Sequence, residues 1–439
     1  MTTTQFLEEK AKSPKMKLTI KVIAIGFIIL ILLIPKMMIM GVIEEREITA
    51  NSAKHEVAEK WSYDQTVRGP VLTIPYVEKI FDNEGKLLKE EIHKYHFLPK
   101  NLMVEGEIFP KELHRSIYQS VVYETSLQIS GDFEKPDFDR LKIKPEDIQW
   151  DKAKLAIAIN DLRGINSMVE INWNGKTYPF SPGMENKLIG ENGISLDIPV
   201  DEGQNLPAKF TINLDLKGSE TLQFAPAAET TVVKLKSSWN DPGFQGLFLP
   251  AERNISKEGF DAQWKVLSYN REFAQEWKDN EYKITSADFG VKLVIVADHY
   301  QKSTRSAKYG VLIILFVFLS FFLNEVITNQ RIHPFQYILV GFAVLIFYLL
   351  LLSISEHLGF NPAYLVSAIL VSVMVLIYSR SFLKSWTNAA GLTSILAISF
   401  GFIYILLQLE SYALLVGSVG LFLVLGLTMF FTRKINWYD

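Results

Sequence analysis

Two neighbouring histidines, His93 and His96, are the first residues whose type and spacing could bind a metal ion. They fall in a segment whose pattern predicts a β-strand, where residues three apart point to opposite faces of the sheet. No third ligand follows nearby, and the chain contains no cysteine, which excludes thiolate ligands and disulfides. We therefore interpret both histidines as surface or structural residues and predict no metal site.

Catalytic motifs give no alternative. The chain has no H-E-x-x-H, G-x-S-x-G, P-loop or Rossmann glycine pattern in a suitable context. Serine, histidine and acidic residues are present, but their spacing does not indicate a nucleophile with its base. We expect no catalytic residue, no cofactor and no enzymatic activity.

Polar residues beside long apolar stretches are the second group that could do chemistry, because ionisable side chains are costly in lipid. Glu325 lies near the end of one such stretch, Glu356 and His357 end the next, and Glu410 follows a third. All lie within about one helical turn, about 5 Å, of a predicted membrane interface. They are our candidate functional residues, and this position favours anchoring of helix ends over an ion path, which needs groups near the midplane.

The elements that carry these residues are apolar stretches long enough to cross a membrane, since about 20 helical residues span the hydrocarbon. They are predicted at residues 22–43, 310–328, 337–355, 362–379, 389–408 and 412–431. The first resembles a signal peptide, because Lys15, Lys17 and Lys21 precede it. No small-residue cleavage site follows before Glu44, so we interpret it as an uncleaved anchor.

The orientation of these spans follows from basic residues near their ends, which favour the cytoplasm. The N-terminal tail contains several lysines, and the short predicted outer turns contain neither lysine nor arginine. The basic residues of the inner side are Arg331, Arg380, Lys384, Arg433 and Lys434. Both termini are then cytoplasmic, with tails at 1–21 and 432–439, an anchor at 22–43, and a five-helix bundle at 306–431.

The remaining segment, residues 44–305, is predicted to be a periplasmic domain. Short alternating stretches are separated by turns such as Asn174-Gly175 and Asn192-Gly193, a pair that suits two-residue hairpins. A short helix from Ala50 to Gln65 is expected to lead out of the membrane. The predicted fold class is therefore a six-span membrane α-helical bundle plus a large antiparallel β-rich, sandwich-like extracytoplasmic domain.

Composition agrees with a multi-pass membrane protein that carries a large soluble part. Apolar residues make up 49% of the chain, yet its 45 basic and 48 acidic residues concentrate between the first and second spans. A formal net charge of −3 leaves no basic stripe for nucleic acid. The expected partners are the lipid bilayer and other envelope proteins or cell-wall components, and no pattern indicates an oligomeric state.

Several segments combine turns with aromatic or charged residues in unusual ways. Read as local structure, those of the β-rich region are turn-rich joints with buried aromatics. The main ones are Arg68-Gly69-Pro70, Asp161-Leu162-Arg163-Gly164, Trp239–Pro250, Asp298-His299-Tyr300-Gln301-Lys302, Arg331-Ile332-His333-Pro334, Ser355–Phe360 and Thr432–Tyr438.

These segments, in this order and over nearly the whole chain, resemble the CreD family of bacterial inner-membrane proteins. One departure is that Asn240-Asp241-Pro242 follows Trp239, where the family has Pro-His-Pro. The resemblance implies a role in envelope stress and no established catalysis. It also implies a link to a two-component regulon, tolerance to a colicin and β-lactam resistance.

Our leading hypothesis is therefore a non-enzymatic protein of cell-envelope integrity, whose outer domain binds or braces an envelope component. The alternative is a transporter or lipid-handling protein that uses spans two to six. In that case Glu356, His357 and Glu410 line its outer mouth and Glu325 its inner one. An enzyme acting on cell-wall or lipid substrates has the least support.

Overall fold

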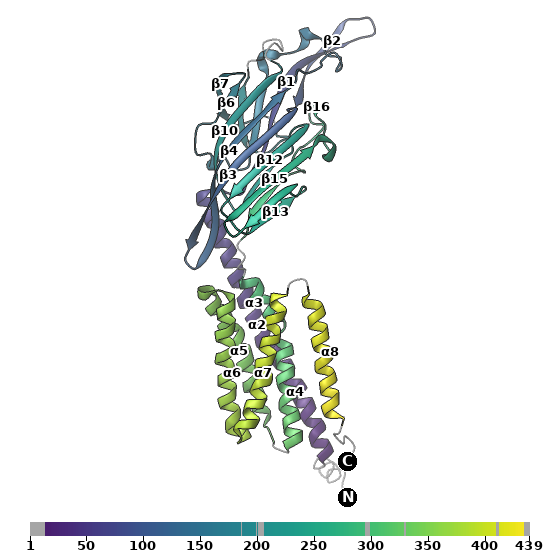
Figure 1. Ribbon diagram of the computed structural model, residues 1–439. Helices are drawn as coiled ribbons and strands as arrows, with labels where there is room; N and C mark the ends of the chain where they lie inside the picture. Colours follow the sequence, from purple (N-terminus) through teal and green to yellow (C-terminus); the bar gives the residue numbers. More distant parts are fainter. Residues whose placement is uncertain are drawn as a thin grey trace. The chain divides into compact units, whose positions relative to one another are not determined.

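The computed structural model describes residues 14–185, 187–198, 200, 206–294, 299–328, 331–409 and 412–433. They divide into two compact units. Ser52–Val296 form a β-sheet domain, here called the β domain, and Met1–Asn51 with Ala297–Asp439 form a helical unit, here called the bundle. Figure 1 labels the elements of both units.

The described residues contain seven α-helices, formed by the apolar stretches and the segments beside them. They are α2 (Pro14–Trp61), α3 (His299–Lys308), α4 (Gly310–Thr328), α5 (Pro334–Leu358), α6 (Phe360–Leu383), α7 (Trp386–Gln408) and α8 (Ala413–Thr432). In the described part of the chain, five helices are long and apolar enough to cross a membrane, or six if the bent pair α3–α4 is one span. Each predicted span coincides with one of these helices.

Capping residues set the ends of the bundle helices. Pro334 occupies the first turn of α5, where its missing N–H costs nothing. The imidazole of His333 accepts a hydrogen bond from the N–H of Phe335 there. Gly359 ends α5 with a φ of 77°, a conformation that glycine adopts without steric cost. Ser385 caps α7 by accepting from the N–H of Asn388.

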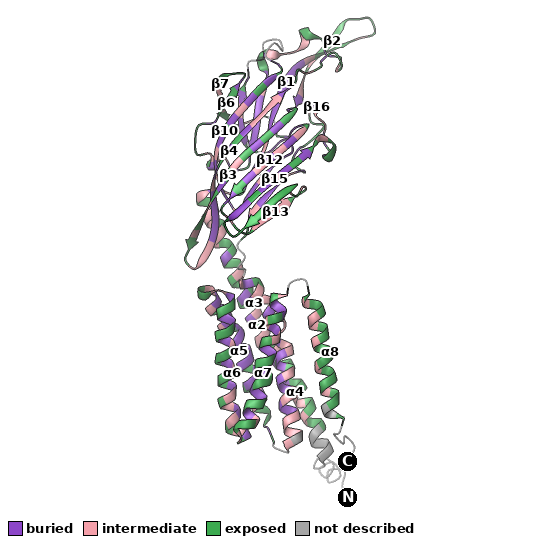
Figure 2. Ribbon diagram, in the orientation of Figure 1, coloured by how far each residue is buried: buried purple, intermediate pink, exposed green. Residues whose placement is uncertain are grey.

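Helices α5, α6 and α7 pack side by side, and α4 packs against α5 and α7 (Figure 1). Their buried faces are apolar, whereas α8 exposes most of its side chains (Figure 2). Exposed apolar side chains suit a helix surrounded by lipid. Helix α2 is continuous from Pro14 to Trp61 and includes both the predicted span 22–43 and most of the short helix predicted from Ala50.

Two sheets form the β domain. The first has the order β13–β17–β11–β1–β5–β9–β8, with β2 on β1 and β16 on β2. Its strands are β1 (Gln65–Phe81), β2 (Leu87–Phe97), β5 (Lys154–Ile159), β8 (Ser181–Pro182), β9 (Gly193–Asp197), β11 (Thr221–Phe224), β13 (Pro242–Gly246), β16 (Glu276–Lys278) and β17 (Phe289–Leu293).

The second sheet has the order β14–β15–β12–β3–β4–β10–β6–β7. Its strands are β3 (Asn101–Arg115), β4 (Tyr118–Phe133), β6 (Glu170–Trp173), β7 (Lys176–Pro179), β10 (Ala208–Ser219), β12 (Thr230–Ser237), β14 (Glu252–Ser256) and β15 (Gly259–Leu267).

The sheets are mixed rather than purely antiparallel, which corrects the sequence-based prediction. β1 pairs with β11 in parallel, and β12 pairs with β3 in parallel. Alternation within a strand reports which face is buried, but it does not report the direction of a neighbour that comes from distant sequence. Asn174-Gly175 does form the predicted hairpin turn, between β6 and β7, with positive φ at both residues. Asn192-Gly193 does not join two strands as a hairpin, because Gly193 is the first residue of β9.

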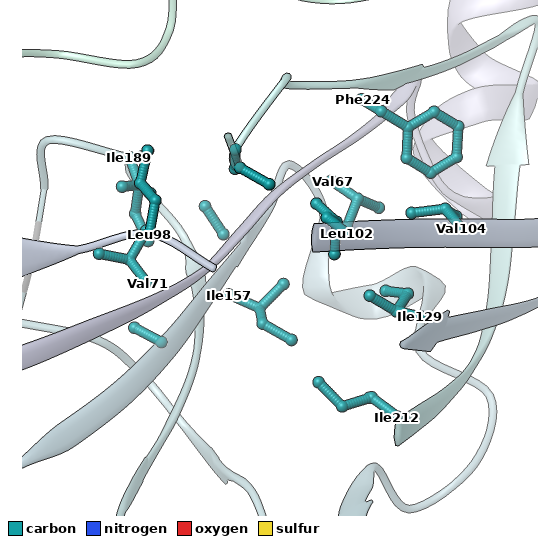
Figure 3. Close-up of a cluster of buried hydrophobic side chains, with 14 of the residues drawn as sticks. Val67, Val71, Leu98, Leu102, Val104, Ile129, Ile157, Ile189, Ile212 and Phe224 are labelled. Carbon is teal, nitrogen blue, oxygen red and sulfur yellow. The ribbon is translucent and has the colours of Figure 1, made fainter. Parts of the chain in front are cut away.

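One cluster of buried apolar side chains contains residues of both sheets. Figure 3 shows side chains of the first sheet meeting those of the second. The labelled members are Val67, Val71, Ile157 and Phe224 from the first sheet, Leu102, Val104, Ile129 and Ile212 from the second, and Leu98 and Ile189 from connecting segments. This common core holds the domain together without disulfides.

Candidate functional site

Glu325, the first of the sequence-predicted residues, lies near the end of α4 and forms an ion pair with Lys21 of α2. The Lys21 ammonium also donates to the carbonyl oxygen of Ile332, at 2.8 Å, and lies over the ring of Tyr337. The side chains of both ionic partners are less than one-fifth exposed. Glu325 therefore joins two helices, and its charge is matched locally.

Glu356 lies near the opposite end of the bundle, in the last turn of α5. Its carboxylate accepts a hydrogen bond from the hydroxyl of Tyr300 at 3.0 Å, and the Arg46 guanidinium lies 3.9 Å away. His357, the next residue, is exposed. Glu410 lies outside the described residues. Glu325 and Glu356 are not brought together, and each is engaged with a cation of α2.

Buried hydroxyl groups are a feature of the bundle that was not predicted from the sequence. The sequence-based candidates were ionisable residues near the ends of the spans. Within the described chain, several such hydroxyls have no hydrogen-bond partner, and Tyr348 lies in the middle of α5. The set is Ser303, Ser306, Tyr337, Tyr348, Ser367, Ser379 and Thr393. An unpaired buried hydroxyl is costly, so these groups are the polar atoms a solute or water would meet inside the bundle.

The β domain contains an open cleft with a volume of about 1160 Å³. Its floor is the outer face of the first sheet, where strands β1, β2, β5 and β9 lie side by side. Its walls include Glu185, residues 187–191 and residues 279–283. The last two segments meet where the N–H of Ile284 donates to the carbonyl of Leu188. The cleft has the size of a ligand site, but most of its lining residues are charged or polar.

Charged residues of both signs line this cleft, and no tyrosine, tryptophan or phenylalanine of the described residues does. The lining side chains with charge are Lys94, Lys152, Lys154, Lys187, Lys283, Asp151, Glu185, Glu191, Asp197 and Asp279. Glycans are usually held by stacking on aromatic rings, because each ring offers a flat apolar face. A ligand with both carboxylates and amines fits this lining better.

Glu185 bridges the cleft between two lysines. Its carboxylate lies 3.0 Å from Nζ of Lys94 and 2.6 Å from Nζ of Lys154. Hydrogen bonds from Lys154 and Lys94 lower the pKa of Glu185 to about 2. The carboxylate therefore stays ionised at neutral pH and holds both lysines in place.

His96 lies at the floor of the cleft, and His93 lines the same cleft. Nδ1 of His96 lies 2.9 Å from the hydroxyl of Thr73, and its ring contacts the indole of Trp277. Burial lowers the pKa of His96 to about 4, so the ring is neutral at neutral pH. His93 lies 2.6 Å from Oδ2 of Asp279. Within the described residues, no group of three or more histidine, aspartate or glutamate side chains could hold a metal ion.

The turn-rich segments of the β domain hold the structure together by buried polar contacts. Arg68 forms an ion pair with Asp288. The Asp161 carboxylate accepts hydrogen bonds from the N–H of Tyr63, the hydroxyl of Ser62 and the guanidinium of Arg163. Arg68 lies within strand β1 rather than in a turn, whereas Asp161 caps the helical turn Leu162–Gly164, so the second segment, unlike the first, is a turn as predicted.

Nearly the whole chain matches one known protein family. A sequence profile described as "Inner membrane protein CreD" matches residues 17–438. The chain belongs to the CreD family. Inner membrane protein CreD of Escherichia coli strain K12 is 34% identical over 420 residues, which cover 93% of this chain and 91% of the relative.

One solved structure aligns with part of this member of the CreD family. The crystal structure of an M1 zinc metallopeptidase from Deinococcus radiodurans aligns with 38% of each chain, at 7% identity and a TM-score of 0.19. That score is too low to support a shared fold.

The cleft of this CreD family member was not visible in the sequence. Its charged residues come from strands and connecting segments between Thr73 and Lys283, and none of them forms a local motif. The only available signal was the exclusion of aromatic residues from segments rich in lysine and acid, such as Glu185–Glu191. That pattern is also typical of an ordinary solvated surface, so it could not single out the site.

Proposed function

We propose that this protein is a non-enzymatic component of cell-envelope integrity, anchored by its bundle and binding an envelope component through the β domain. The cleft, with its lysine and carboxylate lining, is the observation that carries the proposal. It combines the volume of a ligand site with side chains that can pair with both charges of a zwitterionic ligand. The bundle supports the anchoring role, because Glu325 and Glu356 are matched by Lys21 and Arg46.

The orientation that goes with this function has both termini in the cytoplasm and the β domain in the periplasm. It rests on the basic residues of the predicted inner loops, namely Arg331, Arg380 and Lys384, and on their absence from the predicted outer turns. In this orientation the cleft meets wall precursors and other periplasmic proteins. The protein then has little cytoplasmic mass of its own, and any inward signal passes through partners.

Gene deletion with complementation tests this function. Deletion is expected to lower survival under a β-lactam or a membrane-active agent, and the wild-type gene is expected to restore it. A variant with both Lys187→Glu and Lys283→Glu reverses charge on the two cleft walls and is expected not to restore survival. Lys265→Glu is the matched control, since Lys265 is equally exposed but lies on β15 of the other sheet. Equal survival of the deletion strain and the wild type would overturn the proposal.

A second candidate function is movement of a small solute or lipid through the bundle. The unpaired buried hydroxyls favour it, in particular the Tyr348 hydroxyl in the middle of α5. Replacing Glu325 and Glu356 with glutamine, and Tyr348 with phenylalanine, removes the ionisable ends and the central hydroxyl. If all three variants restore survival as well as the wild type does, this candidate is excluded.

A further inference from the structure

Strand β2 has one edge that is covered over only part of its length. Its inner edge pairs with β1 from Phe97 to Leu87. Its outer edge pairs with β16 at only three positions, Phe97, His96 and Tyr95. Among the described residues, no strand pairs with the outer edge between Leu87 and Lys94.

Asp279 is the residue that ends the pairing on this edge. Its N–H donates to the carbonyl of Lys94, and its carboxylate accepts from the N–H of Lys94, both at 2.8 Å. The φ of Asp279 is 46°, which turns the chain away from the sheet. The N–H of Lys94 and His93 lower the pKa of Asp279, against the opposing effect of its burial, so the carboxylate stays charged in this position.

Beyond this stop, the backbone groups of Glu90 and Ile92 that face the outer edge have no partner among the described residues. In a strand, residues two apart direct their N–H and C=O groups to the same side. Lys94 directs both groups toward Asp279, so Ile92 and Glu90 direct theirs to the same open side. The Ile92 side chain is 64% exposed and also lines the cleft.

The opposite edge of the β1–β2 hairpin, formed by β1, is partly covered. Tyr76 of β1 forms a bridge with Ile148, and the N–H of Gln149 donates to the carbonyl of Pro75. Lys79 also forms an ion pair with Asp147 in this covering segment. Natural sheets usually cover or charge their edges to prevent unwanted pairing. The segment that includes Glu90 and Ile92 has charged side chains but no covering strand among the described residues.

We propose that an extended segment of another polypeptide adds to the outer edge of β2 at Glu90 and Ile92, next to the cleft. This inference rests on the proposed binding role of the β domain and names the partner's chemistry. Strand addition obtains affinity from backbone hydrogen bonds and specificity from alternate side chains. A basic side chain suits the position opposite Glu90, and an apolar one suits the position opposite Ile92.

Two-fold pairing of a second copy on this edge is disfavoured when it is centred on Glu90, Glu91 or Ile92. Antiparallel two-fold pairing centred on Glu90 or on Glu91 places two identical carboxylates opposite each other, which destabilises the pair. Pairing centred on Ile92 needs the backbone of Lys94, which Asp279 already occupies. The observations therefore favour a different polypeptide.

A defined peptide tests the proposal with the full-length protein in detergent micelles. The probe is a fluorescent threonine-rich peptide with a central lysine and an isoleucine two residues to each side, so that either strand direction presents the pattern. A matched peptide has glutamate in place of the lysine, and a third has an N-methyl group on the lysine amide. Fluorescence anisotropy gives the Kd of each.

The wild-type protein is expected to bind the lysine peptide about fivefold more tightly than the glutamate peptide, from the charge pair alone. Glu90→Lys is expected to reverse this preference. Glu90→Pro removes the outward N–H without touching the pairing with β1, and it is expected to weaken binding about tenfold. The N-methylated peptide is expected to bind as weakly. Glu91→Gln is the control, because Glu91 directs its backbone toward β1, and its affinity should not change.

The proposal is overturned if the lysine peptide does not bind at about 1 mM, or if N-methylation leaves its affinity unchanged. A preference that persists in Glu90→Lys also overturns it, and this variant decides the matter if Glu90→Pro does not fold. Peptide affinity judges this inference, whereas the deletion phenotype judges the proposed function, so either can fail while the other holds.

Discussion

Arg68 and Asp288, which are 220 residues apart, form a two-pronged ion pair in the β domain. Nε and Nη2 of Arg68 lie 2.8 Å and 2.6 Å from the two carboxylate oxygens of Asp288. Their side chains are only 14% and 16% exposed. The pair joins β1 to the residue that precedes β17, across the intervening strand β11.

Asp288→Asn is expected to lower the free energy of unfolding of the β domain by about 3 kcal/mol, because it leaves the Arg68 guanidinium partly buried without its counter-charge. Denaturant unfolding followed by tryptophan fluorescence measures this loss. The double variant Arg68→Met with Asp288→Leu is the control and should lose less, since it leaves no unpaired charge. A double variant as unstable as Asp288→Asn would contradict the argument.

Asp161 predicts a pH dependence in the acid range. Burial alone would raise its pKa, but hydrogen bonds from Arg163 and from the N–H groups of Tyr63 and Arg163 lower it to about 2, against 3.8 ordinarily. Stabilisation from the ionised carboxylate is therefore complete above about pH 4 and disappears as the pH falls toward 2. Asp161→Asn is expected to flatten the dependence of stability on pH in this window, measured as the denaturation midpoint.

His96 predicts a second loss of stability on acidification, in a pH range above that of Asp161. Its folded pKa is about 4 against 6.5 ordinarily, so the unfolded chain binds a proton that the folded domain does not. Stability is therefore full above about pH 6.5 and falls as the pH drops toward 4, by about 3 kcal/mol in total. His96→Gln should remove this dependence. An unchanged pH profile between 6.5 and 4 in the variant would contradict this assignment.

The ion pair of the bundle predicts a non-additive result. Lys21→Met leaves Glu325 less than one-fifth exposed and without its cation, so we expect a loss of about 3 kcal/mol. Adding Glu325→Leu should restore most of it, because the apolar pair needs no compensation. Melting temperatures in detergent measure both variants. Equal melting temperatures of the single and double variants would show that the ion pair does not anchor α4 to α2.

The natural chain has no cysteine, so single cysteines report the orientation directly. Asn83→Cys, in the exposed turn between β1 and β2, is expected to react with a membrane-impermeant maleimide in intact cells. Ser381→Cys, exposed at the end of α6, is expected to react only after the inner membrane is permeabilised. The reverse labelling pattern would place the β domain in the cytoplasm and would overturn the proposed function with it.

The sequence predicted the helices well because their signal is local. About 20 apolar residues in a row can be read without knowing any neighbour, and the caps at Pro334 and Gly359 lie where the apolar stretch begins and ends. The β domain was predicted only in outline. Its two parallel pairs, β1 with β11 and β12 with β3, join segments far apart, and strand periodicity does not encode such partners.

Less of the candidate site than of the fold could be predicted from the sequence. Glu325 and Glu356 were recognised as polar residues beside spans, but their partners Lys21 and Arg46 come from α2, at the other end of the sequence. Similarly, Lys94 and Lys154 come together only through Glu185 in a connecting segment. Charged residues that are brought together only by the tertiary fold form no recognisable motif in the sequence.

The parallel pairing of β1 with β11 has a consequence for how the β domain is synthesised. Gln65 cannot meet its partner Leu222 until more than 150 further residues have been made, which takes on the order of ten seconds at typical translation rates. Hairpins such as β3–β4 and β1–β2 can close at once, whereas Gln65–Val67 at the start of β1 waits for β11. Contacts between distant segments also slow the folding step itself. The nascent domain is therefore most exposed to misfolding and proteolysis before β11 emerges, and chaperones would act in that interval.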